Sequence, residues 1–313
     1  MGDFSGESQL PLAPRPDGDG VAEPSRRSVL AAAGLVVLAS SVLASPLMIA
    51  PPARAAVPPP RLGDPSRGDP AAVAVRFAGA HPSLWGDHLP GTLPRLPVRY
   101  RTIRGRRHPL MALTFDACGN PRPGSCGYDA QLIAVLRRYR VPATLFVSSR
   151  WAAAGSNGRI LTELAADPLF EIGNHGTRHC PLSVTGRSAY GIAGTRSTRE
   201  AADEVWTAQA ALHALIGRAP RLFRTGTAMY DDIGVAVARS LGVLPVGFTV
   251  AADFGATAPA AVVRKQLLAM TPGAIALGHL NHPEKQTAEG LALALPAMLR
   301  AGWVFTQVSR GLS

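Results

Sequence analysis

The chain is poor in cysteine, in aromatic residues and in acidic residues. Its 313 residues include 3 cysteines, 6% aromatic residues, and 21 Asp and Glu against 32 Lys and Arg. No two cysteines have Cys-x-x-Cys spacing, so a thiolate zinc site is not expected. The only dense basic cluster, residues 101–107, has no interleaved aromatic residue. We therefore interpret the charge as a solvated basic face, or as attraction to an anionic cell-envelope polymer, and expect no nucleic-acid partner.

Three cysteines suffice for one disulfide in an exported protein, with one thiol left over. Cys118 and Cys126 are closest in sequence and lie in one predicted loop, so a local disulfide between them is expected. Cys180 directly follows His179, and a disulfide between Cys118 and Cys180 is the alternative.

The N-terminal region has the pattern of a twin-arginine export signal. Arg26 and Arg27 precede an uncharged stretch at 31–50, and Ala53-Arg54-Ala55 is typical of a cleavage site. We expect residues 1–55 to be this signal and residues 56–70 to be a Pro/Gly-rich linker. The alternative is an uncleaved membrane anchor, although three prolines interrupt the apolar run. The mature protein is then expected in the periplasm or outside the cell, with no stable membrane span after cleavage.

From residue 111 onward, short apolar runs alternate with amphipathic segments, which is typical of an α/β protein. One predicted helix has its apolar face at Leu132, Ile133 and Leu136, and Ser197 with Glu200 predicts the capping box of another. The pattern predicts a distorted parallel (β/α) barrel of about seven strands, forming a single domain at 111–313 after an N-terminal extension at 71–110. The predicted strands are 111–115, 143–148, 170–173, 221–223, 244–250, 274–277 and 303–308.

Five ionisable residues each follow a different predicted strand. They are Asp116, His175, Arg224, Asp253 and His279. Because the carboxyl ends of barrel strands meet around one mouth, these residues are expected to share a pocket. His175 and His179 also form a His-x-x-x-His pair, and two imidazoles at this spacing can bind one metal ion, zinc in particular. The alternative is two solvated loop histidines.

These segments resemble the five motifs of the polysaccharide deacetylase family, also called the NodB-homology or carbohydrate esterase family 4 deacetylases. The matching segments are Thr114-Phe115-Asp116, His175 with His179, Arg224, Asp253 and Leu277-Gly278-His279. The resemblance implies a distorted barrel that binds one divalent metal, usually zinc, and removes acetyl groups from N-acetylated sugars. It implies that Asp116 is the general base, that Arg224 contacts it, and that Asp253 orients the general acid His279.

The sequence also departs from these motifs. Ala117 stands where the family has a metal-binding Asp, and Phe254 stands where it has Trp. Asp129 is a candidate replacement ligand, although it also fits a helix N-cap, as Asp231 and Asp232 do. His282 is a further candidate ligand, but Pro283 after it favours an exposed turn. Alternatively, water and substrate oxygen complete the coordination by two histidines.

The sequence thus predicts a metal-dependent hydrolase that removes N-acetyl groups from an N-acetylglucosamine-containing polysaccharide of the cell envelope. Thr225 and Gly226 are predicted to bind substrate, since a backbone N–H of their loop can complete an oxyanion hole. Tyr230 and Trp151 are candidates for stacking on sugar rings, although core packing is the default interpretation of both. The alternative functions are a non-catalytic glycan-binding pseudoenzyme that has lost its metal, and a related amide or ureide hydrolase. The sequence leaves the polymer and the oligomeric state open.

Overall fold

The computed structural model describes residues 68–119 and 125–313. The predicted export signal and most of the predicted linker lie outside these residues. Seven parallel strands form a curled sheet in the spatial order β8-β6-β5-β4-β3-β10-β9. With the helices around it, this sheet is a half-barrel, which confirms the predicted distorted (β/α) barrel. The strands are β3 (Arg106–Ala117), β4 (Ala143–Val147), β5 (Phe170–Asn174), β6 (Leu222–Phe223), β8 (Leu244–Pro245), β9 (Val250–Ala251) and β10 (Ile275–His279).

The segment predicted as one strand at 244–250 is two short strands that belong to opposite ends of the sheet. Strand β8 pairs with β6, and β9 pairs with β10. The segment at 93–96 lies between these two ends of the sheet. Leu93 donates a backbone hydrogen bond to Pro245 in β8, and Leu96 donates one to Gly273, just before β10. The break in the strand therefore lets one segment bridge the two ends of the sheet.

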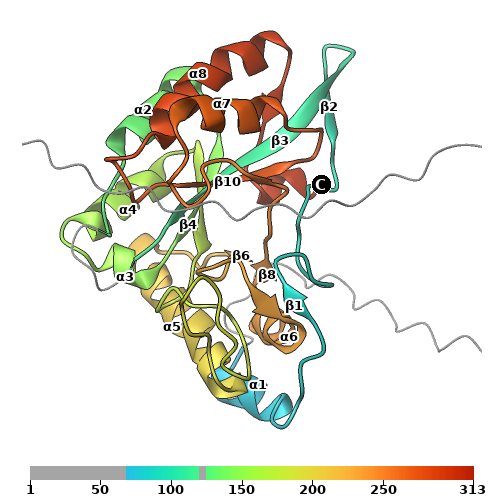
Figure 1. Cartoon of the computed structure of the whole chain (residues 1–313), viewed down its shortest axis with the longest axis vertical. Helices are drawn as coiled ribbons and strands as arrows, with labels where there is room; N and C mark the ends of the chain where they lie inside the picture. The colour runs from blue at the N-terminus through green and yellow to red at the C-terminus, as the bar shows by residue number, and fades with distance from the viewer. Residues whose placement is uncertain (1–67, 120–124) are drawn as a thin grey trace, which may run out of the picture. The chain divides into compact units, whose positions relative to one another are not determined.

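The helices pack in two groups (Figure 1). In one group α8 contacts both α2 and α7, and in the other α5 contacts both α1 and α6. The two predicted helix signals are confirmed: α2 buries Leu132, Ile133 and Leu136, and the side chain of Ser197 accepts the N–H of Glu200 at the start of α5. No helix in the described ranges is both long and apolar enough to span a membrane. The helices are α1 (Pro70–Arg76), α2 (Ala130–Tyr139), α3 (Ser149–Ala152), α4 (Asn157–Ala166), α5 (Thr198–Ile216), α6 (Asp232–Ser240), α7 (Ala260–Leu268), α8 (Thr287–Arg300) and the 3-10 helix η2 (Ser309–Gly311).

Residues predicted as an N-terminal extension form strands that pair with the catalytic domain. Strand β2 (Tyr100–Ile103) forms an antiparallel hairpin with the first part of β3, which begins five residues before the predicted boundary at 111. Strand β1 (Trp85–Gly86) pairs with β7 (Tyr230–Asp231), and β11 (Val304–Phe305) pairs with β3. The resulting β3 is 12 residues long and lies at the centre of the sheet.

The register of the sheet fixes the positions of its carboxyl ends. In β10 and β3, His279 lies opposite Asp116, and in β4 and β5, Val147 lies opposite Asn174. These ends are buried and are supported by a core to which β3, β4 and β5 contribute Leu113, Leu145 and Ile172. Side chains at the strand ends are thus held on rigid elements next to one another.

Candidate active site

Arg224 links three of the strands at the carboxyl edge of the sheet. Its Nη1 donates to Asp116 Oδ1 and to Thr114 Oγ1, both at 2.8 Å, and its Nη2 donates to the Gly247 carbonyl at 2.9 Å. The guanidinium lies over the Phe146 ring, with Cζ 4.3 Å from the ring centroid. Because Arg224 is 0% exposed and Asp116 is 3% exposed, this is a buried ion pair whose hydrogen bonds fix the orientation of Asp116 Oδ1.

His175 follows β5 and lies beside Asp116. Its Nδ1 is 2.8 Å from the carbonyl oxygen of Arg224, and a carbonyl only accepts, so Nδ1 carries the hydrogen. In the neutral ring Nε2 therefore has a free lone pair, and it lies 3.6 Å from Asp116 Oδ2. Burial lowers the pKa of His175, but the charges of Asp116 and Cys118 outweigh this and raise it. The negative charges beside His175 therefore favour a cation at this position.

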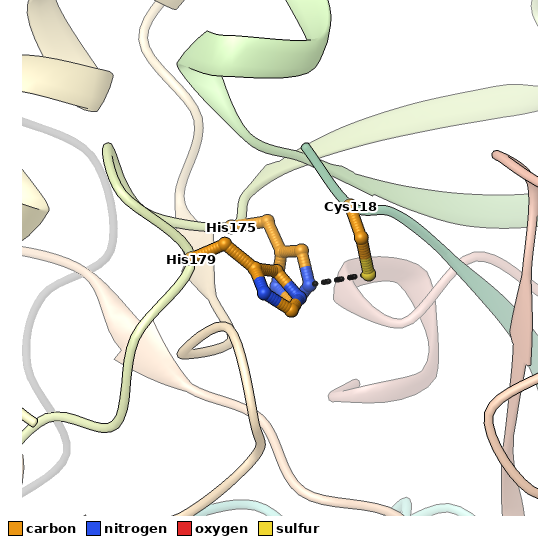
Figure 2. Close-up of side chains that lie close together, drawn as sticks. All are labelled: Cys118, His175 and His179. Atoms are coloured by element: carbon orange, nitrogen blue, oxygen red, sulfur yellow. Dashed lines mark hydrogen bonds between the residues drawn. The ribbon is translucent and has the colours of Figure 1, made fainter. Parts of the chain in front are cut away.

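His175, His179 and Cys118 form a cluster of three metal-binding side chains (Figure 2). Their ligand atoms all lie within 4.8 Å of one another, and Cys118 Sγ is 3.5 Å from His175 Nε2. The two imidazole centroids are 5.0 Å apart, and the buried Nε2 of His179 has no hydrogen-bond partner. Burial raises the pKa of the Cys118 thiol, but His179 and His175 outweigh this and hold it well below its ordinary value. The donor set, with one unpaired ring nitrogen, fits a divalent metal ion.

The loop that carries both histidines is held by Glu204 of α5. The buried Glu204 carboxylate accepts the backbone N–H of Arg178 at 2.9 Å and is 3.3 Å from Arg178 Nε. The backbone carbonyl of Glu204 accepts the N–H and the hydroxyl of Thr177. Helix α5 therefore fixes the backbone between His175 and His179.

Gly226 sets the position of His179 from the other side. A Cβ at Gly226 would overlap the Cα and carbonyl carbon of His179 and would lie 2.8 Å from the Cys180 nitrogen. His179 has a positive φ of 59°, so its backbone is already strained and depends on these neighbours. Gly226 is thus a packing residue beneath the histidine loop.

We expect Gly226→Ala to displace His179 and to weaken metal binding about tenfold or more, as supporting contacts of metal ligands do. Isothermal titration of the metal-free protein with zinc measures this. Gly86→Ala is the matched control, because a Cβ there would meet its nearest neighbour, Leu89, at an ordinary 3.7 Å. Equal zinc affinity in both variants would contradict a positioning role for Gly226.

Asp253 and His279 form a second ion pair, in which Asp253 is buried and His279 is partly exposed. Asp253 Oδ1 is 2.9 Å from His279 Nδ1, and its Oδ2 accepts the His279 backbone N–H at 2.7 Å and the Thr287 hydroxyl at 2.9 Å. Burial lowers the pKa of His279, but the charge and hydrogen bond of Asp253 outweigh this and raise it well above its ordinary value. His279 Nε2–H is consequently the proton that this imidazolium can donate.

Several predicted site residues have structural roles instead. Asp129 lies outside the metal-binding cluster and caps α2, where its Oδ1 accepts the Leu132 N–H at 2.9 Å. His282 pairs with the exposed Glu284, which fits the predicted turn. The Thr225 N–H donates to the Tyr230 hydroxyl at 3.0 Å, so this N–H is not left for substrate, and Tyr230 is 0% exposed and cannot stack on a sugar. Trp151 is likewise fully buried, and Asp231 caps α6.

The predicted disulfide between Cys118 and Cys126 is absent from the structure, and so is the alternative with Cys180. The Cys118 sulfur faces His175, whereas Cys180 is buried near Glu204, and burial followed by the Glu204 charge raises its pKa to about 12. The cysteine spacing predicts no thiolate ligand, whereas the structure places Cys118 with His175 and His179. The signal was its position two residues after Asp116, because alternate residues of a strand point to the same face.

The chain is similar to known proteins in sequence and in fold. Residues 104–246 match the family model described as polysaccharide deacetylase. A chitooligosaccharide deacetylase from Bradyrhizobium sp. (strain ANU 289) is 28% identical over 227 residues, which are 67% of this chain and 94% of that protein.

Two solved structures share the fold. A carbohydrate esterase family 4 pseudoenzyme from Bacillus anthracis has 21% identity and a TM-score of 0.53. The match covers 65% of each chain, so this chain spans just under two thirds of the length of that protein. A family 4 acetyl xylan esterase from Clostridium thermocellum, in complex with a cobalt ion, has 22% identity and a TM-score of 0.52, covering 64% of this chain and 89% of that chain. The matches confirm the resemblance indicated by the motifs: residues 104–246 are similar to the polysaccharide deacetylases, and the chain shares the fold of the carbohydrate esterase family 4 structures.

Proposed function

We propose that this protein is an exported, metal-dependent hydrolase that removes N-acetyl groups from an N-acetylglucosamine-containing polysaccharide of the cell envelope. One observation carries the proposal: Asp116, paired with Arg224, and His279, paired with Asp253, lie opposite each other on adjacent strands beside the His175–His179 pair. The similarity to a chitooligosaccharide deacetylase supports the substrate class. Amide hydrolysis needs a proton acceptor, stabilisation of an oxyanion and a proton donor, and this edge of the sheet has groups for each.

The proton acceptor is Asp116 Oδ2. Arg224 holds Oδ1, whereas Oδ2 points toward His175, so a water between Oδ2 and the acetyl carbon would transfer its proton there. The proton donor is His279, whose Nδ1 is held by Asp253 and whose Nε2 can protonate the departing amine. His175 and His179 would hold the metal, which we propose to be zinc. When bound, it supplies Lewis acidity toward the acetyl oxygen and toward water.

Phe254 supports a carbohydrate substrate. It directly follows Asp253, has a positive φ of 49°, and leaves 51% of its surface exposed. An exposed aromatic ring beside a catalytic pair is suited to packing on the apolar face of a sugar ring. Of the aromatic residues considered for sugar stacking, Tyr230 and Trp151 are fully buried, so Phe254 replaces them in the proposal.

The test is acetate release by the purified protein from N-acetylglucosamine oligomers and from peptidoglycan fragments, before and after removal of metal by a chelator. We expect release that stops on chelation and returns with zinc. A protein that binds these oligomers without releasing acetate under any metal would instead be the glycan-binding pseudoenzyme, an alternative that Ala117 favours. Release only from small linear amides or ureides would identify the other hydrolase class.

The pH dependence of the reaction tests the role of His279. Because Asp253 raises the pKa of His279, the imidazolium persists to higher pH, and activity is lost only as the pH rises through that raised value. Asp253→Asn removes the charge, so the basic limb of the profile of kcat/KM against pH should move to lower pH. Glu284→Gln, at an exposed carboxylate beside His282, is the control and should leave the limb in place. An unmoved limb in Asp253→Asn would exclude His279 as the proton donor.

A further inference from the structure

We propose that the Cys118 thiolate is the third protein ligand of the metal, completing a Cys-His-His site that selects zinc or cobalt over magnesium and manganese. The inference rests on the proposed function in that it concerns the same site. Cys118 takes the place of Asp129, the replacement ligand that the sequence suggests, because Asp129 caps α2 and lies outside the cluster.

The spacing of the donor atoms matches a tetrahedral ion. With Zn–S of about 2.3 Å, Zn–N of about 2.0 to 2.1 Å and a tetrahedral angle, the sulfur and the nitrogen are separated by about 3.6 Å. The structure has Cys118 Sγ at 3.5 Å from His175 Nε2. The His179 ligand atom lies within 4.8 Å of both, so all three donor atoms are close enough to be brought onto one ion by rotation of side chains.

Both imidazoles present the correct atom. His175 is fixed through its Nδ1–H on the Arg224 carbonyl, which leaves Nε2 for the ion. His179 Nε2 is buried and has no hydrogen-bond partner, which is unfavourable for a polar atom away from water. A metal ion between the three side chains would satisfy that nitrogen. Figure 2 shows the two imidazole rings close together, with the Cys118 sulfur beside them.

Strand alternation explains why the sulfur takes this position. Asp116 and Cys118 point to the site, whereas Ala117 between them is 0% exposed and belongs to the core cluster of β3, β4 and α2. Ala117 therefore packs in the core, and the next residue, Cys118, provides the negatively charged ligand. A thiolate is a soft ligand that favours zinc and cobalt, whereas magnesium and manganese prefer oxygen.

The proposal is tested by cobalt spectroscopy on the purified full-length protein, stripped of metal and reloaded with Co²⁺ under reducing conditions. We expect a sulfur-to-cobalt charge-transfer band in the near ultraviolet. The band should be lost in Cys118→Ser and retained in Cys126→Ser, which is the matched control. Zinc affinity should fall at least tenfold in Cys118→Ser, and excess Mg²⁺ should not displace cobalt from the parent.

A second variant keeps the test valid if Cys118→Ser fails to fold. Cys118→Asp should bind one equivalent of cobalt without the band, because an oxygen replaces the sulfur. Cobalt bound to the parent without the band, or a band unchanged in Cys118→Ser, would overturn the proposal. So would activity that survives chelation but is abolished by alkylation of Cys118, since the thiol would then act as a nucleophile.

The two proposals can fail separately. A charge-transfer band in a protein that releases no acetate would support Cys118 as a metal ligand and contradict the deacetylase activity. Zinc-dependent acetate release without the band would support the deacetylase activity and contradict Cys118 as a metal ligand.

Discussion

Replacement of Asp116 by Asn is expected to lower kcat/KM for acetate release by about 100- to 10,000-fold, the usual contribution of a general base. Asn keeps the shape of the side chain, and its Oδ1 can still accept the Arg224 hydrogen bond seen at 2.8 Å. It cannot take a proton from water. The loss should therefore appear in kcat, with little change in binding of the oligosaccharide, and initial rates with N-acetylglucosamine oligomers measure it.

The control must separate loss of the base from loss of the fold, because Asn leaves the buried Arg224 with less compensating charge. Asp129→Asn serves this purpose: Asp129 is equally buried, at 2% exposed, but caps α2 and lies outside the catalytic pairs. Circular dichroism of both variants should show folded protein at the assay temperature. If Asp129→Asn lost as much activity as Asp116→Asn, the effect would be structural and Asp116 would not be the base.

The carboxyl-edge placement of the site could be predicted because it follows from local patterns. Asp116, Arg224 and His279 each follow a short apolar run, and in a parallel barrel such ends converge. The motifs also predict which of these residues pair. The structure contains both predicted ion pairs, that of Asp116 with Arg224 and that of Asp253 with His279. What the sequence could not show is which side chains turn inward.

Tyr230 and Cys118 illustrate the limit. An aromatic residue in a site loop is equally compatible with sugar stacking and core packing, and only the packing of Tyr230 against Phe223 decides for the core. Cys118 follows the end of β3, and its direction depends on how far the strand continues past Asp116. Because β3 runs to Ala117, alternation brings the Cys118 sulfur back to the site, and a boundary shifted by one residue would have changed this.

Arg224→Met is expected to lower the free energy of unfolding by about 3 to 5 kcal/mol, the effect of removing one partner of a buried ion pair. Four acceptors lose their donor: Asp116, Thr114 and the carbonyls of residues 246 and 247. The apolar Met still packs on Phe146, so lost packing contributes little. Urea unfolding followed by circular dichroism measures the change.

Arg199→Met is the matched control, since Arg199 pairs with Asp203 on the exposed face of α5, where such a pair contributes about 0.3 to 0.5 kcal/mol. Arg224→Lys adds a second comparison. It keeps a positive charge but cannot reach Asp116 on β3 and Gly247 beyond β8 at once, so its stability should lie between those of the parent and Arg224→Met. If Arg224→Met unfolded at the same urea concentration as Arg199→Met, the pair would not stabilise the barrel. In the expected case the residue that orients the base also joins β6, β3 and the backbone that follows β8, so loss of the guanidinium should loosen the strand ends that carry the catalytic groups.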